Sequence, residues 1–164
     1  MGTDTSFILH ELKRIDTDIT VLQTQRINDH ITILPWNYSS ITQGTFAFYM
    51  DPNQAMQVLF NNDVSSANGD QINYIVGFEA GTWTFNLLGA TINNSGILDI
   101  LIDGVSIGTQ DWYTAATTYN VIKNITGISI NTGVKMVSLK INGKNAFSSS
   151  YRMRLTSLAF WRTA

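Results

Sequence analysis

The chain has 164 residues, of which 44% are hydrophobic and only 13% are charged, and its formal net charge at pH 7 is -2. This length allows one hydrophobic core of moderate size with an appendage. The many Ile, Leu, Val and Phe residues exclude a strongly disordered chain, and the lack of excess Lys and Arg argues against a nucleic-acid partner. With no Cys, neither a disulfide framework nor a thiolate metal site is expected.

The N-terminal residues show a helical pattern. Pro35 ends it, because proline lacks an amide hydrogen and disfavours helix in the residue before it. Apolar residues recur before Pro35 at spacings of four and three, at Ile8, Leu12, Ile15, Ile19 and Leu22. Such a narrow seam is typical of a coiled coil, and Ile at both core positions favours three strands over two. We therefore predict a trimeric N-terminal coiled coil in residues 1–34, helical from about Ser6 to Leu34; the alternative is one amphipathic helix packed on its own domain.

From Trp36 onward the apolar period changes to two. We expect strands at Thr45–Met50, Val58–Asn61, Ile72–Phe78, Thr82–Leu88, Ile97–Ile102, Thr118–Ile122, Ile125–Ile130, Val134–Ile141 and Arg152–Trp161. Asp103-Gly104 and Asn142-Gly143 are strong hairpin signals between such runs. Trp83 alternates with polar neighbours, so it should lie in the core. Residues 35–164 are thus predicted to form an all-β, two-sheet antiparallel jelly-roll sandwich.

Charges in the predicted sandwich are sorted by sign. All acidic residues after Pro35 lie between Asp51 and Asp111, and all basic ones lie between Lys123 and Arg162. In one interpretation, strands from the two halves are neighbours and their charges pair weakly in water. In the other, the two signs meet across a subunit interface: Arg152 and Arg154 alternate with apolar residues and would share an outer face, where an arginine covered by a neighbouring subunit would need an acidic partner.

Residues suited to catalysis are scarce in the predicted sandwich. His10 and His30 both precede Pro35, so neither a Ser-His-Asp triad nor a histidine-bound metal is expected there. Glu79 is the only Glu of this region and stands in a predicted turn, which leaves no evident carboxylate pair for glycoside hydrolysis. No phosphate-binding glycine pattern is present. We predict no catalytic residue, no metal site and no cofactor, and the chain is not expected to be an enzyme.

A loop between two predicted strands combines aromatic, amide and carboxylate side chains. Sugars are held by aromatic faces together with such polar partners, and loops lie at the surface. The candidate ligand-binding residues are Asp111, Trp112, Tyr113, Tyr119 and Asn120. The alternative is that Trp112 and Tyr113 fold inward and cover one end of the sandwich. Tyr151 and Trp161 are further candidates.

Two stretches, which together span about Gly81 to Thr163, resemble known families. Gly81-Thr82-Trp83-Thr84-Phe85, followed by Gly96–Ile100, Asp103-Gly104, Asp111-Trp112-Tyr113 and Tyr119-Asn120, looks like the middle of galactose-binding-like β-sandwiches found as carbohydrate-binding modules. Gly133–Lys140, Gly143-Lys144-Asn145 and Ser148–Arg152 are similar to a later segment of the same modules, with Lys135 in place of the usual His. Chains of this kind that end in a run such as Leu155–Thr163 also resemble the C-terminal domains of bacteriophage tail and head fibres, which are trimers with a helical or fibrous stem.

These resemblances imply a viral appendage on the virion surface. Its N-terminal coiled coil would form the homotrimer and attach to a virion protein, and its C-terminal knob would contact host-surface glycans. A purely structural virion decoration protein and a cellular carbohydrate-binding module are the alternatives. Neither a signal peptide nor a run of ~18 apolar residues is visible, so we expect neither secretion by the usual route nor membrane insertion.

Overall fold

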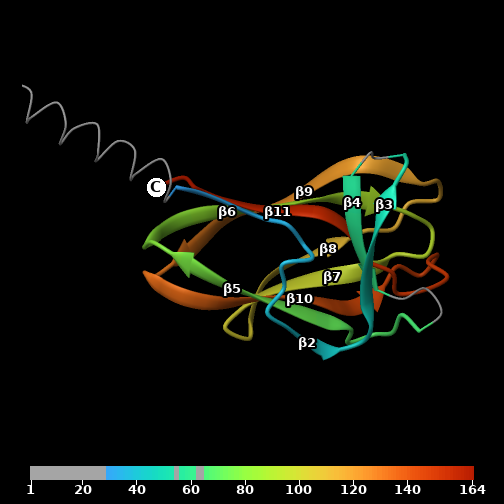
Figure 1. Cartoon of the computed structure of the whole chain (residues 1–164), viewed down its shortest axis with the longest axis horizontal. Helices are drawn as coiled ribbons and strands as arrows, with labels where there is room; N and C mark the ends of the chain where they lie inside the picture. Colours follow the sequence, from blue (N-terminus) through green and yellow to red (C-terminus); the bar gives the residue numbers. More distant parts are fainter. Residues whose placement is uncertain (1–28, 54–55, 62–64) are drawn as a thin grey trace, which may run out of the picture.

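The computed structural model describes residues 29–53, 56–61 and 65–164. Figure 1 shows two stacked layers of strands. In these residues the strands are β1 (His30–Ile33), β2 (Ser40–Gln43), β3 (Phe46–Asp51), β4 (Met56–Asn61), β5 (Gln71–Phe78), β6 (Gly81–Thr91), β7 (Gly96–Ile102), β8 (Val105–Asp111), β9 (Thr118–Ile130), β10 (Gly133–Lys144) and β11 (Arg154–Arg162). No helix that could cross a membrane occurs in the described part of the chain.

The strands form two antiparallel sheets, which confirms the predicted all-β jelly-roll sandwich. Sheet 1 has the order β3-β4-β11-β6-β9, with β1 also paired to β11, and sheet 2 has the order β2-β5-β10-β7-β8. Strand β11 pairs with β6 along one edge, and β1 and β4 share its other edge. A Cβ atom on Gly89 of β6 would collide with the carbonyl oxygen of Arg154, so glycine is required where β6 approaches β11.

Aromatic side chains join the two sheets. Trp83 and Phe85 of β6 point into the core, as the alternation in the sequence predicts, and both are buried. Phe78 of sheet 2 packs edge-on against Trp83 and Phe160 of sheet 1, with ring centroids 5.1 Å and 5.6 Å apart. Edge-to-face pairs of this kind add ~0.5–1.5 kcal/mol each beyond the burial of their surface. The sheets are therefore held by directional contacts as well as by buried area.

The predicted Asp103-Gly104 hairpin joins β7 to β8. Both residues have positive φ angles, 49° and 82°, as the central residues of a type I′ turn require. The backbone amide of Met136 donates a 2.9 Å hydrogen bond to the Asp103 carboxylate, and Lys135 pairs with it at 3.1 Å. These two contacts, the amide first, lower the pKa of Asp103 below its ordinary value. The hairpin tip is thus fastened to β10.

The chain enters and leaves the sandwich at one end. The Arg162 amide donates to the Asp29 carbonyl at 2.9 Å, and the side chains of these residues form an ion pair at 3.2 Å. The Thr82 amide also donates to the carbonyl oxygen of Ala164. Figure 1 shows the C-terminus beside the start of β1. The residue before β1 is therefore fixed to the end of β11, and Ala164 is fixed to β6.

The predicted helix does not reach Leu34. His30–Ile33 instead form β1, antiparallel to β11. Ile31 and Ile33 pack against the core, whereas His30 and Thr32 are exposed, so buried and exposed side chains alternate here as in a strand. Residues 30–33 therefore belong to the sandwich. The proposed seam residues lie outside the described residues, so the coiled coil and the trimer stay predictions.

Other strand boundaries also differ from the prediction. Asn142-Gly143 is not a hairpin: it lies inside β10, at a register shift between Ile141 and Lys144, where Gly143 has a φ of 94°. One type of bulge has a glycine in the left-handed conformation, as hairpin turns also do. The two strands expected at Thr118–Ile122 and Ile125–Ile130 are the single strand β9, and the exposed strand β2 was not predicted.

Two ion pairs join an acidic residue of the first half to a basic residue of the second within one chain. One is the exposed pair of Asp103 and Lys135. The other is the buried pair of Arg154 and Asp51, 2.9 Å apart and only 8% and 1% exposed. Tyr49 and Asn53 also donate hydrogen bonds to Asp51, and desolvation lowers the pKa of Arg154. Contacts within one chain thus account for these two pairs without a subunit interface: the first joins the β7–β8 turn to β10, and the second joins β3 to β11 across β4.

We expect Asp51→Asn to lower the free energy of unfolding by ~3–5 kcal/mol, because it leaves the Arg154 guanidinium covered and without its counter-charge. Urea denaturation measures the loss. Asp103→Asn is the matched control, since it removes the acid of the exposed pair and should cost far less. Equal losses in the two variants would show that burial of the Asp51 pair has no particular energetic weight.

Candidate functional site

Three loops meet at the end of the sandwich opposite the C-terminus. They are residues 92–95, 112–117 and 145–153, which follow β6, β8 and β10 (Figure 1, right). Backbone hydrogen bonds join them: Ser149 donates to Asn93 at 3.1 Å, Arg152 to Asn94 at 2.9 Å, and Thr114 to Ile92 at 3.4 Å. The loops therefore support one another as a unit.

A carboxylate and an amide set the shape of two of these loops. The Asn145 side chain donates a 2.7 Å hydrogen bond to Asp111. Asp111 also accepts from the amide of Tyr113, and Asn145 accepts from the amide of Phe147, at 2.9 and 3.0 Å. Each is an Asx turn, in which a side chain caps the backbone two residues later. Asp111 and Asn145 are hydrogen-bonded to each other. The aromatic residues two positions after them, Tyr113 and Phe147, are therefore brought close together.

Tyr113 and Phe147 consequently lie side by side. Their ring centroids are 6.4 Å apart, with an angle of 33° between the planes. Phe147 is 79% exposed, more than any other large hydrophobic side chain of the described residues, whereas Tyr113 is half-buried. We call Asp111, Tyr113, Asn145 and Phe147 the aromatic loop site. It offers apolar ring surface to solvent, next to polar loop backbone.

The structure brings together only part of the predicted site. Asp111 and Tyr113 belong to the aromatic loop site, but Trp112 is 2% exposed and is part of the core. The inward alternative therefore holds for Trp112, and its expected role as a surface contact is wrong. Tyr119 is half-buried and Asn120 exposed on β9, and no hydrogen bond or ring contact in the described part of the chain joins either to Asp111 or Tyr113. A role for these two stays a prediction.

Asn145 and Phe147 were not predicted as site residues. A signal for them exists in the sequence, because Asp-x-Tyr at 111–113 recurs as Asn-x-Phe at 145–147. Both patterns place an Asx-turn former two residues before an aromatic ring. The pairing of the two turns depends on β8 and β10 ending at the same end of the sandwich, which the sequence alone does not specify.

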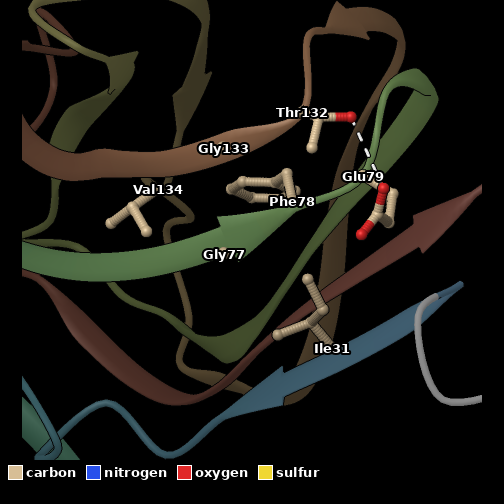
Figure 2. Close-up of a pocket in the computed structure, with 7 residues that line it drawn as sticks. All are labelled: Ile31, Gly77, Phe78, Glu79, Thr132, Gly133 and Val134. Atoms are coloured by element: carbon tan, nitrogen blue, oxygen red, sulfur yellow. Dashed lines mark hydrogen bonds between the residues drawn. The ribbon is translucent and has the colours of Figure 1, made fainter.

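A concave surface lies at the opposite end of the sandwich. This pocket of about 370 Å³ is lined by Ile31, Gly77, Phe78, Glu79, Thr132, Gly133 and Val134. Figure 2 shows its two polar side chains together, with the Thr132 hydroxyl donating to Glu79 at 3.4 Å. Phe78 is buried in the core and presents no free ring face. The pocket therefore has fewer features than the aromatic loop site for holding a hydroxyl-rich ligand.

Metal ligands do not gather at either place. Within residues 29–53, 56–61 and 65–164, no three His, Cys, Asp or Glu side chains form a group that could hold a metal ion. In the aromatic loop site, both carboxylate oxygens of Asp111 already accept hydrogen bonds from the protein.

No family model and no curated protein matches this sequence. Solved structures do match it. The CBM36-1 domain of a multidomain xylanase from the hindgut metagenome of Trinervitermes trinervoides is 17% identical, with a TM-score of 0.64 over 82% of this chain and 98% of that one. The module CBM36 in complex with calcium and xylotriose is 16% identical, with a TM-score of 0.60 over 79% and 98%. CBM6cm-2 from Cellvibrio mixtus lichenase 5A, in complex with cellotriose, is 18% identical, with a TM-score of 0.56 over 82% and 98%.

These likenesses show that the chain has the β-sandwich fold of carbohydrate-binding modules. The expected resemblance to such modules is thereby confirmed at the level of the fold. None of the three structures is a phage fibre, so the viral origin stays a prediction.

We expect Asn145→Ala to loosen the aromatic loop site. The substitution removes the bond to Asp111 and the cap on the Phe147 amide, and a lost hydrogen bond of this kind costs ~1–3 kcal/mol. Amide hydrogen exchange should become faster at residues 145–148, with β5 and β10 unchanged. Asn142→Ala is the control, because Asn142 makes only a 3.4 Å contact with Asp99. Unaltered exchange in the Asn145 variant would contradict the bracing role.

Proposed function

We propose that this chain is a non-catalytic glycan-binding module and that the aromatic loop site is its contact surface. The observation that carries the proposal is the exposed Phe147 ring, held beside Tyr113 by the bonded pair of Asp111 and Asn145. Xylotriose and cellotriose bound to modules of the same fold support this choice of ligand class.

The chemistry of the site suits a sugar ring. A pyranose has an apolar face of C–H groups, which packs on an aromatic ring, and a rim of hydroxyls, which needs hydrogen-bond partners. Phe147 offers the ring, and the Tyr113 hydroxyl and the exposed Ser149 side chain, two residues after Phe147, offer polar partners. Because the loops are already bonded to one another, little ordering entropy is lost on binding.

No metal ion takes part in this proposal. One structure of the same fold holds calcium together with its xylotriose. Here the Asp111 carboxylate already accepts two protein hydrogen bonds, and Ca²⁺ binds through six to eight oxygen ligands, more than this site supplies. Glycan binding should therefore persist in EDTA.

We expect Phe147→Ala to weaken glycan binding about tenfold or more, equivalent to ~1.4 kcal/mol, because the exposed stacking face is lost. A glycan array that includes xylo- and cello-oligosaccharides identifies the probe, and titration calorimetry measures the change. Phe48→Ala is the matched control, since Phe48 is also a surface phenylalanine, 56% exposed, but lies on β3. Binding of no glycan by the intact protein, or equal binding by the two variants, would overturn the proposal.

The finer proposal is a homotrimeric viral appendage joined to the virion through its N-terminus. It is supported by the heptad-like seam from Ile8 to Leu22 and by the resemblance of the C-terminal run to phage fibres. Three linked sites would raise a weak affinity through effective concentration. A cellular carbohydrate-binding module is equally compatible with the fold neighbours. A structural decoration protein is the function to adopt if no glycan binds.

The trimer predicts a mass of three 18.2 kDa chains by sedimentation equilibrium at micromolar concentration. Replacing both Ile15 and Ile19 with Asn should reduce this mass to that of one chain, because the seam loses its apolar contacts. Thr17→Asn together with Thr20→Asn is the control, since these positions lie off the seam. A single-chain mass for the unaltered protein, or a trimer that survives the Ile substitutions, would contradict the proposed seam.

A further inference from the structure

A tryptophan is exposed on the outer face of sheet 1, far from the aromatic loop site. Trp161 lies near the end of β11 and is 48% exposed, whereas Trp83 and Trp112 are buried. It points outward because its neighbour Phe160 points into the core. It lies seven positions after Arg154, which is at the loop end of the strand, and so about 23 Å away at ~3.3 Å per residue. The two surfaces therefore do not overlap.

The strand register surrounds Trp161 with a defined set of neighbours. His30 of β1 and Thr84 of β6 lie directly opposite it on either side. The His30 ring packs against the Trp161 ring at a centroid distance of 5.6 Å, and His30 Nε2 lies 3.2 Å from the Thr32 hydroxyl. The indole is thus braced along one edge. One face of a braced ring is available without the cost of ordering it.

The next row on the same face is small and polar. Ala159 lies two residues before Trp161 on β11, with Thr32 of β1 and Asn86 of β6 opposite it, and Asn124 of β9 lies beyond Asn86. Because the Ala159 side chain is short, it projects little from the sheet and leaves the side of the indole ring uncovered. The Asn86 side-chain nitrogen is buried and has no hydrogen-bond partner within the described part of the chain.

The side chains around the indole are hydroxyl, amide and imidazole groups, without Asp, Glu, Lys or Arg in either row. The nearest ion pair, Asp29 with Arg162, is already formed. The outer face of sheet 2 differs, since exposed Ile75 and Met136 lie directly opposite each other there and offer no hydrogen bonds. An aromatic face among uncharged donors and acceptors fits a neutral, hydroxyl-rich ligand better than a protein or an anion.

We propose that Trp161, with His30, Thr32, Thr84 and Asn86, forms a second glycan-contact surface that takes a neutral oligosaccharide lying across β1, β11 and β6. This inference rests on the proposed function in one respect, namely that glycans are the ligands of this chain. It adds a site at the other end of the molecule, on a flat sheet face. One module could then hold two separate glycan chains, or two stretches of one long chain.

Iodide quenching of tryptophan fluorescence tests the proposal on the full chain. Iodide reaches exposed indoles, so quenching should report mainly Trp161 and, to a lesser extent, half-buried Trp36. The probes are the hexasaccharides of β-1,4-linked glucose and of β-1,4-linked xylose. A saturating probe should reduce quenching in the unaltered protein and also in Phe147→Ala, where the aromatic loop site is removed. If iodide fails to quench Trp161 even without a probe, the surface is covered and the proposal is overturned.

Calorimetry with substituted chains completes the test. In the Phe147→Ala background, we expect Trp161→Ala to weaken the remaining glycan affinity about fivefold or more, which corresponds to ~1 kcal/mol. Ile122→Ala is the matched control, since Ile122 is 65% exposed on β9 of the same sheet, and it should leave binding unchanged. Melting curves confirm that the variants fold, and the quenching result does not depend on any substitution at Trp161.

The outcomes separate this inference from the proposed function. If Phe147→Ala abolishes all binding and the probes leave quenching unchanged, the second surface is overturned and the aromatic loop site stands. Residual binding in Phe147→Ala that depends on Trp161 supports two surfaces. Binding that depends on Trp161 but is indifferent to Phe147 supports the second surface and overturns the first. If neither probe binds the unaltered chain, both are overturned for these glycans.

Discussion

The pairing of β11 on both of its edges is the constraint on which the rest of the sandwich depends. One edge is occupied by β6, and the other is divided between β4, opposite Arg154 and Leu155, and β1, opposite Leu158–Trp161. Residues more than a hundred positions apart are thereby aligned. The same strand contributes Leu155, Leu158 and Phe160 to the core and carries the buried Arg154. A shift of one residue along β11 would turn each of these side chains to the wrong face.

The pairing of β11 also determines where the aromatic loop site is located. Because β11 starts beside the three joined loops, the loop before it, which carries Phe147, is delivered to the same end as Tyr113. The loops are anchored in the core by Trp112 and Met153, and the bond between Asp111 and Asn145 and the two Asx turns then define the shape of their exposed part. Polar side chains therefore shape the exposed part of the site, while the core holds the bases of its loops and the strand ends from which they start.

The sequence predicts those features that a single strand or turn encodes. The alternation around Trp83 indicates the buried face of β6, and Asp103-Gly104 indicates a two-residue turn. It is ambiguous where two structures share a pattern. Ile31 fits both a helical spacing from Ile27 and a strand alternation with Ile33, and only pairing with β11 decides between them. Gly143 needs its positive φ in a bulge as much as in a hairpin. The direction of Trp112 and the meeting of Tyr113 with Phe147 depend on how distant loops close, which no local pattern records.

The junction of Asp29 with Arg162 has a mechanical consequence. Because Asp29, just before β1, is bonded to Arg162, at the end of β11, any load on either residue reaches the sandwich at one pole, through the adjacent ends of β1 and β11. The three joined loops are at the other pole. Force between a tether and a ligand held there would run along the strands, in the direction that loads many interstrand hydrogen bonds in shear at once. In a molecule attached in this way, hydrogen bonds along the whole length of the strands share the pulling force.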